Sequence, residues 1–238
     1  MKDKSNRTSK KGVIREYIEA IVVAVLIALC LRAFVIEAFK IPTGSMIPTL
    51  KIGDHIFVNK FVYGLRIPYT KIRFFDFKTP KRGEVIVFIF PLDNSKDYIK
   101  RVVGLPGDTI ELKEGLLFVN ETPVTQTAAQ DLTLLNDLPD GDKFNLFTEK
   151  TGEAEHYTQY FKYEDPQNYG PRTVPPGKLF VMGDNRNRSY DSRGWGFVPL
   201  SNVKGRALFV WLSLDTENRV PLIGLPRIRW ERFGKMIH

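Results

Sequence analysis

Three observations predict a mainly β, antiparallel fold preceded by one N-terminal transmembrane helix. The chain has 238 residues, enough for a membrane anchor plus one or two modest domains. One apolar run of helix length lies near the N-terminus. After it, short apolar runs alternate with Gly, Pro and Asp, and no helix-length amphipathic segments separate them. Hydrophobic residues make up 43% and charged residues 26%, which is typical of a folded protein.

The tail at 1–15 is basic. Six Lys or Arg residues and one Asp precede Glu16 and account for +5 of the formal net charge of +8. The rest of the chain is only mildly basic, whereas a nucleic-acid-binding protein carries its positive charge on the folded domain. A short basic tail before an apolar run fits the positive-inside rule. We therefore expect no nucleic-acid partner and a tail that stays in the cytoplasm.

The segment 16–37 predicts a transmembrane signal anchor. Within it, "YIEAIVVAVLIALCLRAFVI" has about the 20 residues that an α-helix needs to cross hydrocarbon. Glu19 and Arg32 lie near its ends, where long polar side chains can reach the headgroups. A cleavable signal peptide is the alternative, but the following "RAFVIEAFK" offers no convincing small-x-small cleavage site. An uncleaved anchor is favoured, with everything after about Ala38 on the outer side.

Strand-length runs rich in β-branched and aromatic residues follow the anchor. They are "HIFVNKFVYG", "GEVIVFIFP", "DTIELKEGLLFVN", "KLFVMGD" and "RALFVWLSLD". Glu114 and Gly115, between "TIELK" and "LLFVN", predict a hairpin turn. From Thr122 to Pro176 the composition becomes polar and the strand signals fade, which indicates an elaborated insertion or a second small domain.

Metal-dependent and histidine-dependent chemistry find little support in the sequence. The single cysteine, Cys30, lies within the apolar run and the three histidines are far apart, so neither a disulfide nor a zinc motif is expected. No P-loop or dinucleotide-binding pattern occurs, and we expect no metal and no cofactor. His238 is the last residue, His156 lies in the polar insertion and His55 alternates within an apparent strand, which disfavours a Ser-His-Asp triad.

The stretch "IPTGSMIPTL" places Ser45 in a tight turn. Gly44 permits unusual backbone angles and the close approach of another segment, while Pro42 and Pro48 stiffen both flanks. Such a turn would present the serine hydroxyl in a fixed position. An ordinary turn serine is the alternative interpretation of this stretch alone.

Lys100 lies in the otherwise apolar stretch "DYIKRVVGLPGD". Burial disfavours the charged form of a lysine and lowers its pKa. At the reference pKa near 10.4, roughly one lysine in a thousand is neutral at pH 7.4, and a drop of about two units raises this to roughly a tenth. A neutral buried lysine can act as the general base for a serine. The alternative is a strand lysine that extends to solvent.

A third stretch, "GDNRNRSYDSRGWGFVP", is dense in polar residues between apolar strands. Within it, Asp191 and Arg193 could form an ion pair, and Ser189 could hold a lysine amine by hydrogen bonding. The alternative is a solvated loop with local side-chain turns.

Together these stretches resemble the bacterial type I signal peptidases. Four segments stand in the family's order behind a membrane anchor: "IPTGSMIPTL", "GDHIFVNKFVYG", "YIKRVVGLPGD" and "GDNRNRSYDSRGWGFVP". The resemblance covers most of the chain from Phe39 to Leu214 except the insertion. It implies a catalytic antiparallel β domain in two parts, 38–108 and 176–238, with an inserted smaller β domain at 109–175.

The resemblance also implies a role for each matching residue. Ser45 would be the nucleophile and Lys100 the general base, a Ser/Lys dyad that works through an acyl-enzyme. The main-chain N–H of Ser45 and the hydroxyl of Thr43, where many relatives carry serine, would form the oxyanion hole. The residues that would orient Lys100 and brace the site are Ser189, Asp191 and Arg193. Shallow pockets for the small side chains before the cut would be lined by Ile41, Pro42, Met46, Leu50, Tyr98 and Ile99.

The function implied by this resemblance is that of a membrane-anchored serine endopeptidase that removes N-terminal signal peptides from exported preproteins. It would cross the bacterial cytoplasmic (inner) membrane once, with its N-terminus inside and its catalytic domain on the outer, periplasmic face. Its partners would be signal peptides, the lipid bilayer and the secretion channel. Self-cleaving repressors share a Ser/Lys dyad and a β fold but carry a DNA-binding domain where this chain has an apolar segment. An inactive, membrane-tethered β module that binds exported proteins without cutting them is the other alternative.

Overall fold

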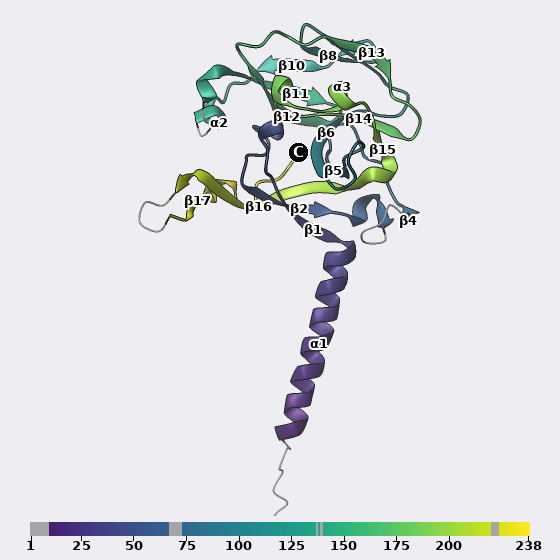
Figure 1. Cartoon of the computed structure of the whole chain (residues 1–238), viewed down its shortest axis with the longest axis vertical. Helices are drawn as coiled ribbons and strands as arrows, with labels where there is room; N and C mark the ends of the chain where they lie inside the picture. The colour runs from purple at the N-terminus through teal and green to yellow at the C-terminus, as the bar shows by residue number, and fades with distance from the viewer. Residues whose placement is uncertain (1–9, 67–72, 137, 139, 220–223) are drawn as a thin grey trace, which may run out of the picture.

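The computed structural model describes residues 10–66, 73–136, 138, 140–219 and 224–238. Figure 1 shows a body of β-sheets from which one long helix, α1 (Lys10–Phe34), stands clear. Every strand pair in the described sheets is antiparallel. The mainly antiparallel β fold predicted from the sequence is thus confirmed.

Helix α1 is long and apolar enough to cross a membrane, by length and composition. Its residues Arg15–Phe34 have a mean hydropathy of 2.3, and none of them is buried against the rest of the protein. The helix ends at Phe34 and the first strand, β1 (Ile36–Lys40), starts two residues later. Lys60 Nζ donates to the carbonyl oxygens of Arg32 at 2.9 Å and Ala33 at 2.7 Å, so the last turn of the helix is capped from the β body.

The largest sheet has eight strands and holds the core beneath the site. Its strands are β1, β2 (Asp54–Asn59), β5 (Val85–Ile89), β6 (Asp97–Gly104), β14 (Lys178–Met182), β15 (Val198–Pro199), β16 (Val203–Arg219) and β17 (Pro226–Ile228). They are ordered β1-β2-β16-β5-β6-β14-β15, with β17 paired to β16. Irregular register along β16 lets this long strand pair with β2, β5 and β17 in turn.

The strand-length runs singled out in the sequence contain β2, β5, β7 (Thr109–Lys113), β8 (Leu116–Val119), β14 and β16. The hairpin predicted between β7 and β8 is confirmed. Glu114 has φ 48° and Gly115 has φ 78°, the left-handed pair of conformations that a two-residue hairpin turn requires.

Residues 109–173 form two smaller sheets above the large one (Figure 1). One has the order β13-β7-β8-β9 and the other β10-β11-β12. Their remaining strands are β9 (Thr122–Pro123), β10 (Thr125–Ala128), β11 (Phe144–Thr151), β12 (Ala154–Phe161) and β13 (Tyr169–Thr173). Short elements elsewhere are β3 (Gly64–Arg66), β4 (Arg73–Asp76), α2 (Thr133–Asn136) and α3 (Ser192–Trp195).

Strands β11 and β12 lie in the polar region from Thr122 to Pro176, where the sequence gives little indication of strands. The side chains on their inward face explain why these strands are hard to recognise in the sequence. Several of them are buried polar groups: Glu149, Thr151, His156, Thr158 and Gln159. The apolar alternation that normally marks a half-buried strand is therefore missing. The polar composition of this region reflects a polar interior.

Two apolar clusters connect the sheets to the site. The first lies beneath the Ser45 turn and contains Ile41, Met46, Leu50, Ile56, Val58, Val85, Val87, Ala207, Val210 and Ile237. The second joins β7 and β8 to β6 and β14 and contains Val103, Ile110, Leu112, Leu117, Val119, Val174, Phe180 and Met182. Strand β6, which carries Lys100, thus belongs to the large sheet and also packs against the first of the smaller sheets.

Candidate active site

The Ser45 turn is a short 3₁₀ helix, Gly44–Met46, whose Met46 side chain is fully buried. The segment after β14 holds this turn by its main chain. Asn185 donates its main-chain N–H to the Ser45 carbonyl and its side-chain Nδ2 to the Gly44 carbonyl, both at 3.1 Å. Backbone bonds of this kind fix the direction of the turn, because each carbonyl is tied to one position. The half-buried Ser45 side chain is therefore presented from a braced loop.

Lys100 reaches this serine from β6. Its Nζ lies 2.6 Å from Ser45 Oγ and 3.0 Å from the Ile99 carbonyl oxygen, and the Lys100 residue is only 4% exposed. Burial lowers the pKa of Lys100 to about 8, although the carboxylates of Asp191 and Asp184 oppose the shift. A neutral amine at this distance can accept the hydroxyl proton of Ser45.

The predicted contact between Asp191 and Arg193 is present. Arg193 donates through Nε to Asp191 Oδ1 at 2.8 Å and through Nη2 to Oδ2 at 2.7 Å. Burial raises the pKa of Asp191, but the Arg193 charge outweighs it and the net pKa lies below its usual range. Asp191 Oδ2 also accepts the Gly183 N–H at 2.9 Å, which ties this ion pair to the main chain beside the Ser45 turn.

Ser189 lies beside Gly183, and no hydrogen bond joins it to Lys100 among the described residues. A Cβ atom on Gly183 would collide with both Ser189 Oγ and the Ser45 carbonyl oxygen, so the three residues meet tightly. Ser189 Oγ is out of solvent contact and makes no hydrogen bond of good geometry within the part of the chain that the structure describes, but it lies near enough to the Asp191 carboxylate to help lower the pKa of that group. Its predicted role in orienting the Lys100 amine stays a prediction.

The residues predicted to surround the substrate divide into two groups. Thr43 and Pro42 are exposed, and Thr43 has an extended backbone (φ −129°, ψ 154°) with no side-chain cap on the turn that follows. Tyr98 and Ile99 are partly exposed at the start of β6. In contrast, three of the predicted pocket residues belong to the buried core cluster and have at most 2% exposed surface: Ile41, Met46 and Leu50. In the described structure these side chains support the turn from below, and their predicted contact with the substrate stays a prediction.

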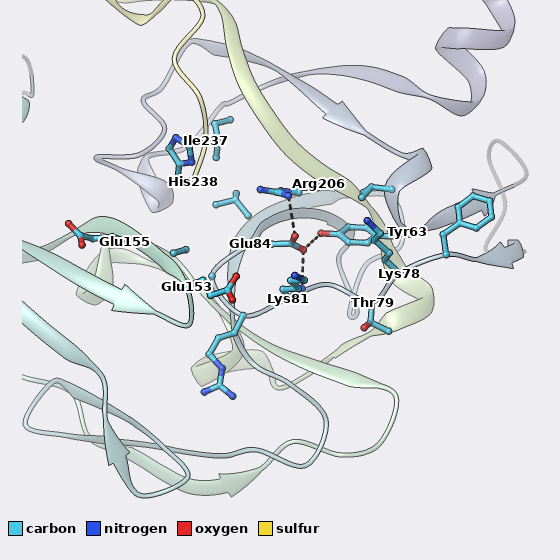
Figure 2. A pocket seen from close by; sticks show the side chains of 16 residues that line it. Tyr63, Lys78, Thr79, Lys81, Glu84, Glu153, Glu155, Arg206, Ile237 and His238 are labelled. Carbon is cyan, nitrogen blue, oxygen red and sulfur yellow. Dashed lines mark hydrogen bonds and ion pairs between the residues drawn. The ribbon is translucent and has the colours of Figure 1, made fainter.

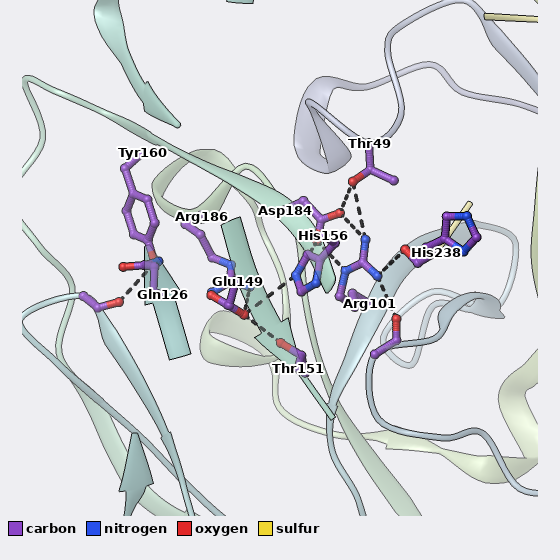
Figure 3. Close-up of polar contacts among 12 residues, drawn as sticks. Thr49, Arg101, Gln126, Glu149, Thr151, His156, Tyr160, Asp184, Arg186 and His238 are labelled. Atoms are coloured by element: carbon purple, nitrogen blue, oxygen red, sulfur yellow. Dashed lines mark hydrogen bonds and ion pairs between the residues drawn. The ribbon is translucent and has the colours of Figure 1, made fainter. Parts of the chain in front are cut away.

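Figure 3 shows a buried polar network that the sequence analysis did not single out. Arg101, adjacent to Lys100, donates to both carboxylate oxygens of Asp184 at 2.8 and 2.7 Å, and both side chains have no exposed surface. Thr49 Oγ1 donates to Asp184 at 2.5 Å, which links the ion pair to the Ser45 turn. The signal available in the sequence was a second cation in an apolar strand, since a buried charge requires a partner.

The same arginine reaches two main-chain carbonyls. Arg101 Nη1 donates to the Gly83 carbonyl at 2.7 Å and to the His238 carbonyl at 2.6 Å. Burial raises the pKa of Asp184, but the charge of Arg101 lowers this pKa by more than burial raises it. The net pKa lies below its usual range and the carboxyl stays ionised. The site therefore contains a buried ion pair, Arg101–Asp184, behind the dyad.

Histidine contributes no base to this site. His156 Nε2 lies 3.7 Å from Glu149 Oε1 and 3.8 Å from Asp184 Oδ1. Burial, together with the charge of Arg101, lowers the pKa of His156 to about 3, so its ring is neutral at ordinary pH. In the described part of the chain, no hydrogen bond joins a histidine to Ser45 or Lys100, and no group of three metal-ligating side chains occurs.

A cavity of about 1080 Å³ lies away from the dyad, between the loop before β5 and the C-terminal residues (Figure 2). Glu84 lies in its wall, accepts hydrogen bonds from the Tyr63 hydroxyl at 2.7 Å and the Lys81 N–H at 2.9 Å, and pairs with Arg206 at 3.2 Å. Neither Ser45 nor Lys100 lines this cavity. The dyad instead lies beside the first part of β6, whose residues Asp97–Lys100 pair, among the described strands, only with β5.

A family model and two relatives from bacteria name the same family. The family model described as "Signal peptidase, peptidase S26" matches residues 14–212. A signal peptidase I of Pseudomonas aeruginosa is 39% identical over 223 residues, which cover 87% of this chain and 75% of the relative. One from Rickettsia typhi is 35% identical over 245 residues, or 94% of this chain and 90% of the relative. A crystal structure of a signal peptidase I from Enterococcus faecalis covers 55% of this chain and 98% of its own at 27% identity, with a TM-score of 0.34.

Proposed function

The chain belongs to the signal peptidase family, peptidase S26, and from this premise we propose that it is a membrane-anchored endopeptidase that removes signal peptides with a Ser45–Lys100 dyad. Membership in this family makes the chain a serine peptidase. The observation that carries the dyad is the 2.6 Å distance between Lys100 Nζ and Ser45 Oγ, combined with the burial of the lysine.

In the proposed reaction, neutral Lys100 takes the hydroxyl proton of Ser45 as Oγ attacks the carbonyl carbon of the scissile peptide bond. The negative charge that develops on the carbonyl oxygen is stabilised by the Ser45 N–H and the exposed Thr43 hydroxyl. The C–N bond then breaks, Lys100 returns the proton to the leaving amine, and the signal peptide remains esterified to Ser45. Lys100 next deprotonates a water that hydrolyses the ester, releasing the signal peptide carboxylate and restoring the serine.

The substrate chain is proposed to bind as an added strand along β6. Residues Asp97–Lys100 have, among the described strands, a free edge that can bond to the main chain of an extended peptide. Pro42, Tyr98 and Ile99 expose part of their surface beside the turn and would contact the small side chains before the cut. Asp191 and Arg193 brace this geometry from behind through Gly183.

Helix α1 is proposed to anchor the enzyme in the cytoplasmic membrane, with the basic tail inside and the dyad on the outer face near the secretion channel. The exposed apolar residues of Arg15–Phe34 support the anchor, and the location of the positive charge supports its orientation. Protease added to intact inverted membrane vesicles should remove the tail and leave the β body protected. Loss of the β body in such vesicles would contradict the orientation.

The test of the function is cleavage of a preprotein that carries an Ala-x-Ala site by the full chain in detergent. The matched control preprotein has Asp in place of the last Ala, because a charged side chain would not fit a shallow apolar pocket. Cleavage directly after the Ala-x-Ala site, and at that site only, is the expected result. Binding of the preprotein without cleavage would contradict the proposal and favour an inactive β module.

A further inference from the structure

The second of the smaller sheets makes several polar contacts with the segment that holds the Ser45 turn. The Gln159 N–H on β12 donates to the Asp184 carbonyl at 2.9 Å. At the end of β12, the Phe161 N–H donates to Asn187 Oδ1 at 2.8 Å, and Asn187 Nδ2 donates back to the Phe161 carbonyl at 3.0 Å. Strand β12 is therefore attached at two places to residues 184–187.

A buried charge pair reinforces this attachment. Arg186 donates to both carboxylate oxygens of Glu149 on β11, at 2.5 and 2.7 Å, and both side chains are 1% exposed (Figure 3). Thr151 Oγ1 donates to Glu149 at 2.8 Å. A bidentate pair of this kind fixes orientation as well as distance. Burial raises the pKa of Glu149, but the Arg186 charge more than offsets it, so Glu149 stays ionised.

The same segment, residues 184–187, also contacts the main chain of the Ser45 turn. Asn185, directly before Arg186, makes the two hydrogen bonds to the Ser45 and Gly44 carbonyls. The Arg186 carbonyl accepts a hydrogen bond from Arg193 Nη2 at 2.5 Å. The side chain of Arg186 is thus held by the smaller sheet, and its main-chain carbonyl is held by Arg193 of the Asp191–Arg193 ion pair.

We propose that Glu149 is a positioning residue for Ser45, acting through Arg186 and Asn185. The smaller sheet β10-β11-β12 thereby has a part in catalysis. Its buried Glu149 carboxylate holds residues 184–187, and these residues hold the turn that carries Ser45. This inference rests on the proposed function, because the role of Glu149 is measured through the rate of the cleavage in which Ser45 is the nucleophile. Glu149 makes no hydrogen bond to Ser45 or Lys100 in the described structure, which separates positioning from chemistry.

The test compares kcat and KM for preprotein cleavage by the wild type and Glu149→Gln. Glutamine keeps the shape of the Glu149 side chain but lacks its negative charge and one of its two acceptor oxygens. One of the two hydrogen bonds from the Arg186 guanidinium is therefore lost. We expect kcat to fall by about tenfold and KM to stay within about twofold, because a misplaced nucleophile slows the chemical step without altering the edge that binds the substrate. The midpoint of the pH profile should stay that of the wild type, since the surroundings of Lys100 are unchanged.

Glu164→Gln is the matched control. Glu164 pairs with Arg188 at 3.3 Å, a contact between the same two regions, but the two side chains are 40% and 43% exposed. It should retain the wild-type kcat. Arg186→Lys provides a second test variant that keeps the buried charge and loses the fork, and its kcat should fall like that of Glu149→Gln while circular dichroism reports a folded protein.

Coupling to Asn185 separates positioning from a general loss of stability. In a double-mutant cycle, the fold-decrease in kcat of the double variant Glu149→Gln/Asn185→Ala should be smaller than the product of the fold-decreases of the two single variants. This is expected because both substitutions loosen the same segment, residues 184–187. Multiplicative losses, or wild-type kcat in Glu149→Gln and Arg186→Lys, would overturn the inference. If the wild type itself fails to cleave the preprotein, the proposed function is what fails.

Discussion

The amine of Lys100 lies 2.6 Å from the hydroxyl of Ser45, although 55 residues separate the two along the chain. Strand β6 delivers the lysine from the middle of the large sheet, and a turn held by Asn185 delivers the serine. Because the two residues are far apart in the sequence, their contact depends on how the surrounding elements are packed. The expected consequences of this arrangement can be measured one at a time.

The first consequence is a pH-dependent rate. Only the neutral amine accepts the serine proton, and burial lowers the pKa of Lys100 to about 8. The cleavage rate should therefore rise between pH 6 and pH 9 and reach half of its maximum near pH 8. Initial rates of preprotein cleavage at saturating substrate would show this. A flat profile across this range would contradict the assignment of Lys100 as the base.

The second consequence concerns stability. In the unfolded chain Lys100 keeps its proton up to about the ordinary lysine pKa of 10.5, whereas the folded protein releases it above a pKa of about 8. Between these values the unfolded state binds more protons, so the free energy of unfolding rises with pH by about 3 kcal/mol from this group. Lys100→Met removes that contribution.

Denaturant unfolding of the wild type and Lys100→Met at pH 8 and pH 10.5 measures the difference. The wild type should gain stability relative to the variant as the pH rises, because every other titrating group is common to both. A constant difference between the two proteins would mean that the folded lysine titrates at its ordinary pKa.

The third prediction tests the buried pair behind the dyad. Asp184→Asn leaves the fully buried Arg101 without a charge partner, which should lower the free energy of unfolding by about 3 kcal/mol. Asp93→Asn is the control, because its ion pair with Lys96 is solvent-exposed and its loss should leave the melting temperature unchanged. Equal melting temperatures for both variants and the wild type would show that the Arg101–Asp184 pair is dispensable for the fold.

The fourth prediction concerns Gly183. A methyl group at this position would meet the Ser45 carbonyl oxygen and Ser189 Oγ, so Gly183→Ala should displace the serine turn. Displacement of a nucleophile by about an ångström costs roughly a hundredfold in rate. We expect kcat to fall by about this factor in a folded protein with a cooperative thermal transition. Activity within a few-fold of the wild type would indicate that the turn adapts to the methyl group.

The sequence was sufficient to predict the fold class and to single out Ser45 and Lys100, the two residues of the proposed dyad, which the structure brings together. A glycine and two prolines mark the Ser45 turn, and a lysine is unusual among the apolar residues around Lys100, but the roles of both residues were implied by the resemblance to signal peptidases. The short apolar runs that became β2, β5, β7, β8, β14 and β16 carry the β signal by themselves. These features are local, so their physical meaning is visible in a short stretch of sequence.

The partners of the buried charges could not be predicted in this way. Arg101 pairs with Asp184 across 83 residues and Arg186 with Glu149 across 37. Nothing in the local pattern says which carboxylate meets which guanidinium, since that depends on how the smaller sheets pack on the large one. The same holds for Ile41, Met46 and Leu50, whose apolar character fits a substrate pocket and a core equally well.

The central claim is tested most directly by single-turnover cleavage of the Ala-x-Ala preprotein with wild type, Ser45→Ala and Lys100→Ala measured side by side. Circular dichroism and melting temperature establish that each protein is folded. The proposed dyad predicts cleavage by the wild type and none above background in either folded variant. Cleavage that survives Ser45→Ala would contradict the mechanism, because the attacking atom would then lie elsewhere.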